Sequence, residues 1–300
     1  MITVDKKGSD KEVFGGIEAG GTKFVCAIGS GPKEIYAISK IDTREPNLTI
    51  REVVNFFQTR QEGISKVLKI GIGSFGPLDL DAKSKTYGQI KKTPKLGWEH
   101  FDIRGELERA LKTQVVIDTD VNVAAMGELT WGYGQALENF LYATIGTGIG
   151  VGAVIKKQII HAEHHPEMGH MFVPLSAHEQ EKFSGNCLFH EGCIEGLASG
   201  SAITERWGSK LCQLQKTHLA WQLEADYLAT FFTNLTFVLQ PQKIIAGGGV
   251  MNEYLLKMVR EILYKKITGY SNIKTSDYLV MPELGSLAGV LGAIALARNS

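Results

Sequence analysis

The chain has few cysteines, no excess charge of either sign and no long uninterrupted apolar run. Four cysteines among 300 residues are too few for the disulfide framework of a small secreted domain. Lys plus Arg and Asp plus Glu each number 32, so no net field favours nucleic acid or an anionic membrane as a partner. The longest uncharged apolar stretch, residues 139–155, contains four glycines and is short for a membrane span. Residues 1–12 lack an apolar core segment, so we expect a cytoplasmic protein.

The remaining composition is typical of a globular enzyme. Hydrophobic residues make up 44% of the chain and charged residues 21%, which is ample for a buried core. A length of 300 residues suits two domains. Cys26 and Cys212 have apolar neighbours in the sequence, and we expect both to be small core residues.

The other two cysteines lie near two histidines. Together they match the number and kind of ligands in a structural zinc site: His170, Cys187, His190 and Cys193. The dense Cys-x-x-His-x-x-Cys run favours zinc over unrelated core cysteines and surface histidines. A zinc protease is excluded because the sequence has no His-Glu-x-x-His pattern. Glu167 and Glu195 flank the ligands, so bound zinc would fix the backbone around two acids.

Apolar periodicity and glycine breaks divide the chain into strands and helices. We expect strands at residues 13–18, 22–29, 34–41, 67–73, 115–117 and 243–246, and helices at 48–60, 101–112, 122–130, from the glycines at 247–249 through 264, and 285–298. A long loop, 82–97, carries three lysines that we expect to be solvated: Lys91, Lys92 and Lys95. Residues 17–28 and 144–155 share a strand–glycine turn–strand layout, which predicts two related α/β halves.

These elements suggest a division of the chain. We expect a flexible lead-in at residues 1–12 and an N-terminal α/β domain formed by 13–122 together with 285–300. Residues 123–284 are expected to form a larger α/β domain that contains the zinc-binding loop.

Three glycine turns follow strands. Backbone N–H groups in such turns approach phosphate oxygens without hindrance from a Cβ atom. A single turn of this kind is weak evidence, but three of them, two related by the repeat, favour ATP as a ligand. Neither a P-loop nor the protein-kinase motifs are present. The first glycine turn is Gly20, Gly21, Thr22 and Lys23, the second is Gly146, Thr147 and Gly148, and the third is Gly247, Gly248 and Gly249.

Phosphoryl transfer also requires a base that takes the proton of the acceptor. Asp120, at the end of a strand and just before a helix, is the best candidate. An N-cap carboxylate is the alternative role for an aspartate at this position. Asp118 competes with it as the base.

Several motifs in sequence order resemble a known family. The motifs are GIEAGGTKF, GIGSFGPLD, TPKLGW, DTDVN, TIGTGIGVG, HPEMGH, CxxHxxCxEGLASG and AGGGV. From about Phe14 to the end, the chain resembles the ROK family (repressors, open reading frames and kinases), and within it the fructokinase branch of sugar kinases.

The resemblance implies an actin/hexokinase-like (ribonuclease H-like) fold of duplicated α/β domains around a cleft. It implies that Asp120 is the base for the sugar hydroxyl and that Glu167, His170 and Glu195 hold sugar hydroxyls with support from Asn122. His170 would then use one ring nitrogen for structural Zn²⁺ and the other for the sugar. Mg²⁺ would arrive with ATP, and we expect a homodimer without nucleic-acid or membrane partners.

Some residues differ from the common family pattern. Glu18 stands where many relatives have aspartate, Thr119 stands where they have asparagine, and Cys187 with His190 replaces a Cys-x-Cys-Gly segment. These differences resemble the fructokinase branch. The sequence therefore predicts ATP-dependent phosphorylation of D-fructose to fructose 6-phosphate. A broader hexose or mannose kinase and a non-catalytic sugar-sensing ROK protein are the alternatives.

Overall fold

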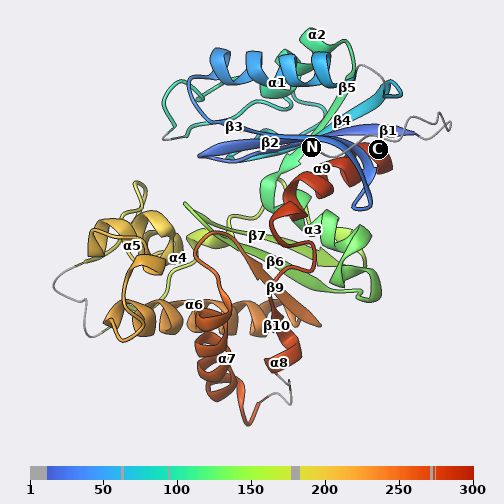
Figure 1. Cartoon of the computed structure of the whole chain (residues 1–300). Coiled ribbons are helices and arrows are strands. Elements are labelled where there is room, and N and C mark those ends of the chain that lie inside the picture. Colours follow the sequence, from blue (N-terminus) through green and yellow to red (C-terminus); the bar gives the residue numbers. More distant parts are fainter. Residues whose placement is uncertain (1–11, 62–63, 94, 177–182, 271–272, 274) are drawn as a thin grey trace. The chain divides into compact units, whose positions relative to one another are not determined.

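The computed structural model describes residues 12–61, 64–93, 95–176, 183–270, 273 and 275–300; apart from Glu12, the lead-in expected at 1–12 lies outside them. Contacts divide the chain into two compact units (Figure 1). Unit 1 comprises the described residues up to Gln135, with His161–His165 and Leu287–Ser300. Unit 2 comprises Ala136–Ile160 and the described residues of Pro166–Ser286. The boundary expected after residue 122 falls inside helix α3 (Asp120–Trp131), which the contacts keep in unit 1.

Unit 1 contains a five-stranded sheet with the order β3-β2-β1-β4-β5. Its strands are β1 (Val13–Ala19), β2 (Lys23–Gly31), β3 (Glu34–Asp42), β4 (Val67–Ser74) and β5 (Gln114–Thr119). β2 pairs antiparallel with β1 and β3, whereas β4 runs parallel to both β1 and β5. The central strand β1 is buried over almost its whole length, as expected for a strand covered on both faces.

Helices cover both faces of this sheet. Figure 1 shows α1 (Pro46–Arg60) and α2 (Ile103–Leu111) over one face and α9 (Ala288–Asn299) against the other. α1 begins at a proline, whose fixed φ suits the first helical position. The Asp102 side chain caps α2 by accepting a hydrogen bond from the Gly105 N–H.

The small residues of α9 allow it to pack closely on α3 and on the sheet. A Cβ atom at Gly292 would lie 1.7 Å from the carbonyl oxygen of Val123 in α3. One at Gly71 in β4 would lie 1.9 Å from the carbonyl oxygen of Ala293. Glycine is therefore required where these backbones touch. Gly285–Leu287, which were expected to begin this helix, form a separate 3₁₀ turn before it.

Unit 2 contains a second five-stranded sheet with the order β10-β9-β6-β7-β8. Its strands are β6 (Phe140–Ile145), β7 (Ile149–Ile155), β8 (Gln158–Ile159), β9 (Lys243–Gly247) and β10 (Leu279–Val280). Its helices are α4 (Ile194–Ala198), α5 (Gly200–Trp207), α6 (Leu219–Leu239), α7 (Glu253–Ile267) and α8 (Thr275–Tyr278). Unit 2 also has 3₁₀ turns at Met168–His170 and Leu211–Gln213, and a further one, Tyr133–Ala136, contains the point in the sequence where unit 1 ends and unit 2 begins.

The expected repeat is confirmed by the two sheets. In each, an antiparallel hairpin (β1–β2 or β6–β7) begins with a strand that also pairs in parallel with a later strand (β4 or β9). Each unit has its own hydrophobic core.

Two features differ from the sequence expectations or were not assigned by them. α6 is buried around most of its circumference and so lacks the apolar stripe that marks an amphipathic helix. Cys26 is buried as expected, but Cys212 is exposed because it lies in a surface 3₁₀ turn. No helix in the described ranges is both long and apolar enough to cross a bilayer.

Candidate functional site

In unit 1, the carboxyl ends of three parallel strands meet at one edge of the sheet. Ala19 of β1 pairs with Ser74 of β4, and Ser74 pairs with Thr119 of β5. Three segments therefore leave the sheet side by side, beginning at Gly20, Phe75 and Asp120. Neighbouring strands lie about 4.8 Å apart, so the first glycine turn and Asp120 are separated by about 10 Å across β4. Ligands of α/β folds bind at edges of this kind.

The first glycine turn is held by hydrogen bonds from its own backbone and from the end of β3. The Gly20 N–H donates to the Lys23 carbonyl over 3.0 Å. Thr43 donates its N–H to the Thr22 carbonyl over 3.0 Å and its hydroxyl to the Gly20 carbonyl over 2.7 Å. Thr22 and Lys23 are exposed. The turn is thus a fixed loop with an exposed hydroxyl and cation, as a phosphate site requires.

Glu18 of β1 lies just before this turn. Burial raises the pKa of its carboxyl above the ordinary value, although Lys23 and Lys40 act in the opposite direction. Within the described residues, no hydrogen-bond partner reaches its buried Oε2. A Cβ atom at Gly289 would lie 2.4 Å from its carboxyl carbon, so the carboxyl group lies against the first turn of α9. Such an oxygen is suited to a cation brought by a ligand.

The two candidate bases have different surroundings. Asp118 is buried, and its Oδ1 accepts from the Thr119 N–H over 2.7 Å and from Nδ2 of Asn122 over 2.8 Å. Its Oδ2 accepts from Nε2 of His161 over 2.7 Å. Asp120 is half-buried at the first position of α3, and its Oδ1 accepts from the Val121 N–H over 2.9 Å. The Thr119 hydroxyl, rather than Asp120, caps the helix. Both oxygens of Asp118 are therefore engaged in holding neighbouring groups.

The His161–His165 segment belongs to unit 1, although the residues on both sides of it belong to unit 2. The hydrogen bond to Asp118 raises the pKa of His161. Burial lowers the pKa of His165, whose Nε2 accepts from the Leu78 N–H over 3.1 Å. His161 was not among the residues expected at the site, because nothing in the local sequence indicates a partner 43 residues earlier.

In unit 2, parallel pairing brings the second and third glycine turns together. Thr144 of β6 pairs with Gly247 of β9, so both turns leave the sheet at the same edge. Gly248 has φ +95°, and a Cβ atom there would lie 2.4 Å from the Ile145 carbonyl oxygen. The Gly200 N–H, at the start of α5, donates to the Gly146 carbonyl over 2.7 Å.

Glu195 is tied to the second glycine turn. Its Oε2 accepts from the Ile149 N–H over 2.9 Å and would lie 2.5 Å from a Cβ atom at Gly148. Glu195 itself stands in the first turn of α4, which Cys193 caps by accepting from the Gly196 N–H over 3.3 Å. Unit 2 therefore links Glu195, the second glycine turn and Cys193 through hydrogen bonds at the start of α4.

The four expected metal ligands come together. One ligand atom from each of His170, Cys187, His190 and Cys193 lies within 4.8 Å of all the others. Nδ1 of His170 is 3.8 Å from each of the two sulfur atoms. A tetrahedral zinc ion would place nitrogen and sulfur ligands about 3.6 Å apart, so the spacing fits.

One further observation agrees with a metal, and the state of Cys193 bears on how a metal would bind. In the described part of the chain, the buried Nδ1 of His190 has no hydrogen-bond partner. Burial raises the pKa of the Cys193 thiol to about 11, so metal binding would have to displace its proton. Backbone hydrogen bonds between residues 171–173 and 192–194 hold the two ends of the loop together. Because His170 faces the sulfur atoms through Nδ1, its Nε2 is left for another partner.

Glu167 and the three loop lysines differ in their exposure. Glu167 is exposed, and its carbonyl accepts from the His170 N–H over 3.0 Å at the 3₁₀ turn. The expectation of three solvated loop lysines holds for Lys92, which is exposed. It is wrong for Lys91 and Lys95, which are half-buried because the loop folds back onto unit 1.

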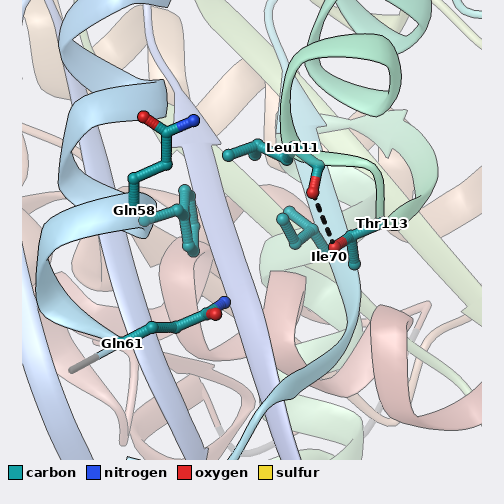
Figure 2. A pocket seen from close by; sticks show the side chains of 6 residues that line it. Gln58, Gln61, Ile70, Leu111 and Thr113 are labelled. Carbon is teal, nitrogen blue, oxygen red and sulfur yellow. Dashed lines mark hydrogen bonds between the residues drawn. The ribbon is translucent and has the colours of Figure 1, made fainter. Parts of the chain in front are cut away.

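A small pocket lies elsewhere in unit 1 (Figure 2). It has a volume of about 50 Å³ and is lined by Phe57, Gln58, Gln61, Ile70, Leu111 and Thr113. The Thr113 hydroxyl, which donates to the Leu111 carbonyl over 3.1 Å, precedes β5. The pocket thus lies toward the amino end of β5, away from Asp120, and it is far smaller than the roughly 300 Å³ of a typical small-molecule site.

Known proteins are similar to this chain over nearly its whole length. The model of the ROK family matches residues 14–300. The chain is 41% identical over 295 residues to a putative fructokinase of Bacillus subtilis, covering 96% of each chain. It is 38% identical over 296 residues to a fructokinase of Zymomonas mobilis, covering 96% of this chain and 97% of that one.

A solved structure supports the fold. The chain resembles a ROK family glucokinase of Streptomyces griseus in complex with glucose and AMPPNP, with a TM-score of 0.76 and 22% identity. The match covers 96% of this chain and 100% of the other. Together with the two repeated sheets, it confirms the expected actin/hexokinase-like α/β fold.

The His161–Asp118 hydrogen bond predicts a pH-dependent stability. The pKa of His161 is raised in the folded protein, so its extra stabilisation is fully present below the unfolded value of about 6.5. That contribution is lost as the pH rises through the folded pKa. We expect the thermal midpoints of the wild type and His161→Asn to differ most at acid pH and to converge at alkaline pH.

Thermal unfolding followed by circular dichroism between pH 5.5 and 8.5 would measure this difference. His164→Asn is the matched control because His164 is an exposed neighbour, and it should follow the wild type at every pH. A gap that widens with increasing pH would contradict the assignment.

Proposed function

The chain belongs to the ROK family, and we propose that it is an ATP-dependent fructokinase in which Asp120 is the general base. The observation that carries the proposal is the identity of 41% and 38%, over nearly the whole chain, to the two proteins described as fructokinases. The glycine turns and acidic groups at the strand ends supply what phosphoryl transfer requires: positioned phosphates and an acceptor for one proton.

The assignment of the base to Asp120 is supported by the surroundings of both aspartates. Asp118 holds Asn122, the Thr119 N–H and His161 with its two oxygens, and it is buried. Asp120 stands at the sheet edge and is half-buried. In the proposed reaction, the sugar hydroxyl gives its proton to Asp120 as its oxygen attacks the γ-phosphorus of ATP. Asn122, positioned by Asp118, would contact a sugar hydroxyl.

The phosphates of ATP are assigned to the three glycine turns. Mg²⁺ accompanies ATP in this proposal and neutralises phosphate charge. Mg²⁺ prefers oxygen ligands, and the Oε2 of Glu18 is a carboxylate oxygen. This oxygen is buried and has no hydrogen-bond partner among the described residues, so it is available for an ion. We assign Glu18 to hold that ion, directly or through its water.

The sugar is assigned to Glu167, His170 and Glu195 of unit 2, and zinc to the four-ligand cluster. The zinc would be structural because four protein ligands leave no open coordination position. It would fix Glu195 through Cys193, which caps the helix that carries this acid. A homodimer and a cytoplasmic location stay predictions.

A hexose panel tests the activity itself. We expect fructose to give the highest kcat/KM in a coupled ADP-release assay, with mannose slower and N-acetylated amino sugars poor. Discrimination would come from buried polar groups left unpaired by the wrong sugar. If glucose or mannose equals fructose, the protein is the broader hexose kinase. If no ADP forms with any sugar of the panel but sugars still bind, the protein is the sugar sensor.

Replacement of the base provides a second test. Asp120→Asn should lower kcat by about 10²–10⁴-fold because an amide cannot accept the hydroxyl proton. Fructose binding, measured by calorimetry, should largely survive because the amide keeps the shape of the side chain. Asp118→Asn is the informative comparison, since it should lower stability more than Asp120→Asn and retain a base. The reverse pattern of activity would assign the base to Asp118.

Removal of zinc provides a third test. Cys187→Ser should lower the zinc content, the thermal midpoint and turnover together. A displacement of Glu195 by about 1 Å is enough to cost roughly 10²-fold in rate. Cys212→Ser is the matched control because Cys212 is exposed and outside the cluster. Purified wild-type protein that is fully active and contains no zinc by elemental analysis would refute the metal assignment.

A further inference from the structure

Lys95 is a loop residue whose backbone is fixed by a buried tryptophan. Its carbonyl accepts from the Trp98 N–H over 3.1 Å. Trp98 is 1% exposed, and its indole N–H donates to the Arg44 carbonyl over 2.9 Å. The indole ring packs against Phe24 and Phe75, with ring centroids 5.5 Å away in both cases. The backbone of Lys95 is therefore held in place three residues before the buried Trp98.

The side chain of Lys95 lies across the first glycine turn. A Cβ atom at Gly21 would lie 2.7 Å from Cε of Lys95 and 3.3 Å from its Nζ. The ammonium group also lies 5.6 Å from the centroid of the Phe75 ring, in a cation–π arrangement. The absence of a side chain at Gly21 thus leaves room for Lys95 as well as for a phosphate.

This place lies on the same sheet edge as the proposed base. Phe75 follows Ser74, which pairs with Ala19 on one side and with Thr119 on the other. Asp120 is the residue after Thr119. The ammonium group therefore lies beside the segments that follow β1 and β4, and Asp120 follows the next strand, β5, about 4.8 Å further along the sheet edge.

Within the described residues, the charge of Lys95 is not matched by an acid. Burial lowers its pKa, and in the described part of the chain no carboxylate forms an ion pair with it. In contrast, the charge of Lys23 opposes the rise in the pKa of the buried Glu18, and the charge of Lys91 contributes to lowering the pKa of Asp79. A partly desolvated cation attracts an anion more strongly than one in water does. The environment of Lys95 is therefore suited to an anion supplied by the substrate.

We propose that Lys95 is a catalytic residue whose ammonium group contacts the γ-phosphoryl group of ATP during its transfer to the sugar. The proposal rests on the proposed function. In the step, the bond from the γ-phosphorus to the oxygen of the leaving ADP breaks and a bond to the sugar oxygen forms. The hydroxyl proton passes to Asp120. Lys95 stays protonated and stabilises negative charge on the phosphoryl oxygens, where that charge lies in the transition state.

Three variants test the proposal: Lys95→Met, Lys95→Arg and, as the matched control, Lys92→Met. Lys92 belongs to the same loop and is exposed. Lys95→Met should lower kcat by about 10²–10³-fold, the loss seen when one stabilising donor is removed. The KM for fructose should stay within about twofold, as expected when an interaction specific to the transition state is lost. Lys95→Arg should recover at least tenfold of the lost kcat, and Lys92→Met should match the wild type.

The measurements are kcat and KM for both substrates, the thermal midpoint, and calorimetric binding of fructose and of a non-hydrolysable ATP analogue. An unchanged kcat in Lys95→Met overturns the proposal. So does a loss confined to fructose binding, which would make Lys95 a sugar ligand. A loss that follows the thermal midpoint and is not recovered by arginine would make it structural. Wild-type protein that phosphorylates no hexose would overturn the proposed function, and the role of Lys95 with it.

Discussion

The parallel pairing of β4 with both β1 and β5 is the constraint on which the candidate site depends. It places Ala19, Ser74 and Thr119 in one row, so that the first glycine turn and Asp120 leave the sheet at the same edge. A register slip of one residue would move Asp120 by about 3.3 Å and reverse the direction of every side chain in the strand. The pairing of β6 with β9 imposes the same order on the other two glycine turns. Each half of the repeat thus presents backbone amides where its strands end.

The parts of this arrangement that depend on local sequence could be predicted. The strands, the glycine turns and the four metal ligands are each marked by composition or spacing within a short stretch, and the structure contains them close to the expected positions. The sequence of helix α6 lacks such a signal. Because this helix is buried on most sides, it has no polar face that would alternate with an apolar face at the helical period. The exposure of Cys212 depends on tertiary packing, which its apolar neighbours in the sequence do not reveal.

The roles of Asp118 and Asp120 show where local information ends. Both follow the same strand, and from the sequence either could be the base. What separates them is His161, which lies 43 residues later and engages the second oxygen of Asp118. An aspartate with its oxygens committed to Asn122 and His161 acts as a fixed support for its neighbours. The same network leaves Asn122 with a fixed orientation, so under the proposed function Asp118 would determine how Asn122 meets the sugar without taking part in the chemistry.

Two different devices fix polar groups in loops of this protein. In unit 2, the proposed zinc ion would hold a loop whose ends are joined by backbone hydrogen bonds, and Cys193 would pass that constraint to α4 and Glu195. In unit 1, the buried Trp98 does the equivalent for Lys95 through packing and one indole hydrogen bond. The reason for the difference is the neighbouring structure. Trp98 has an aromatic core to enter, formed by Phe24, Phe75 and Phe101. The candidate ligand loop instead carries exposed apolar residues, Phe172, Leu188 and Phe189, so under the proposed zinc site its described ends would be held by ligation rather than by burial.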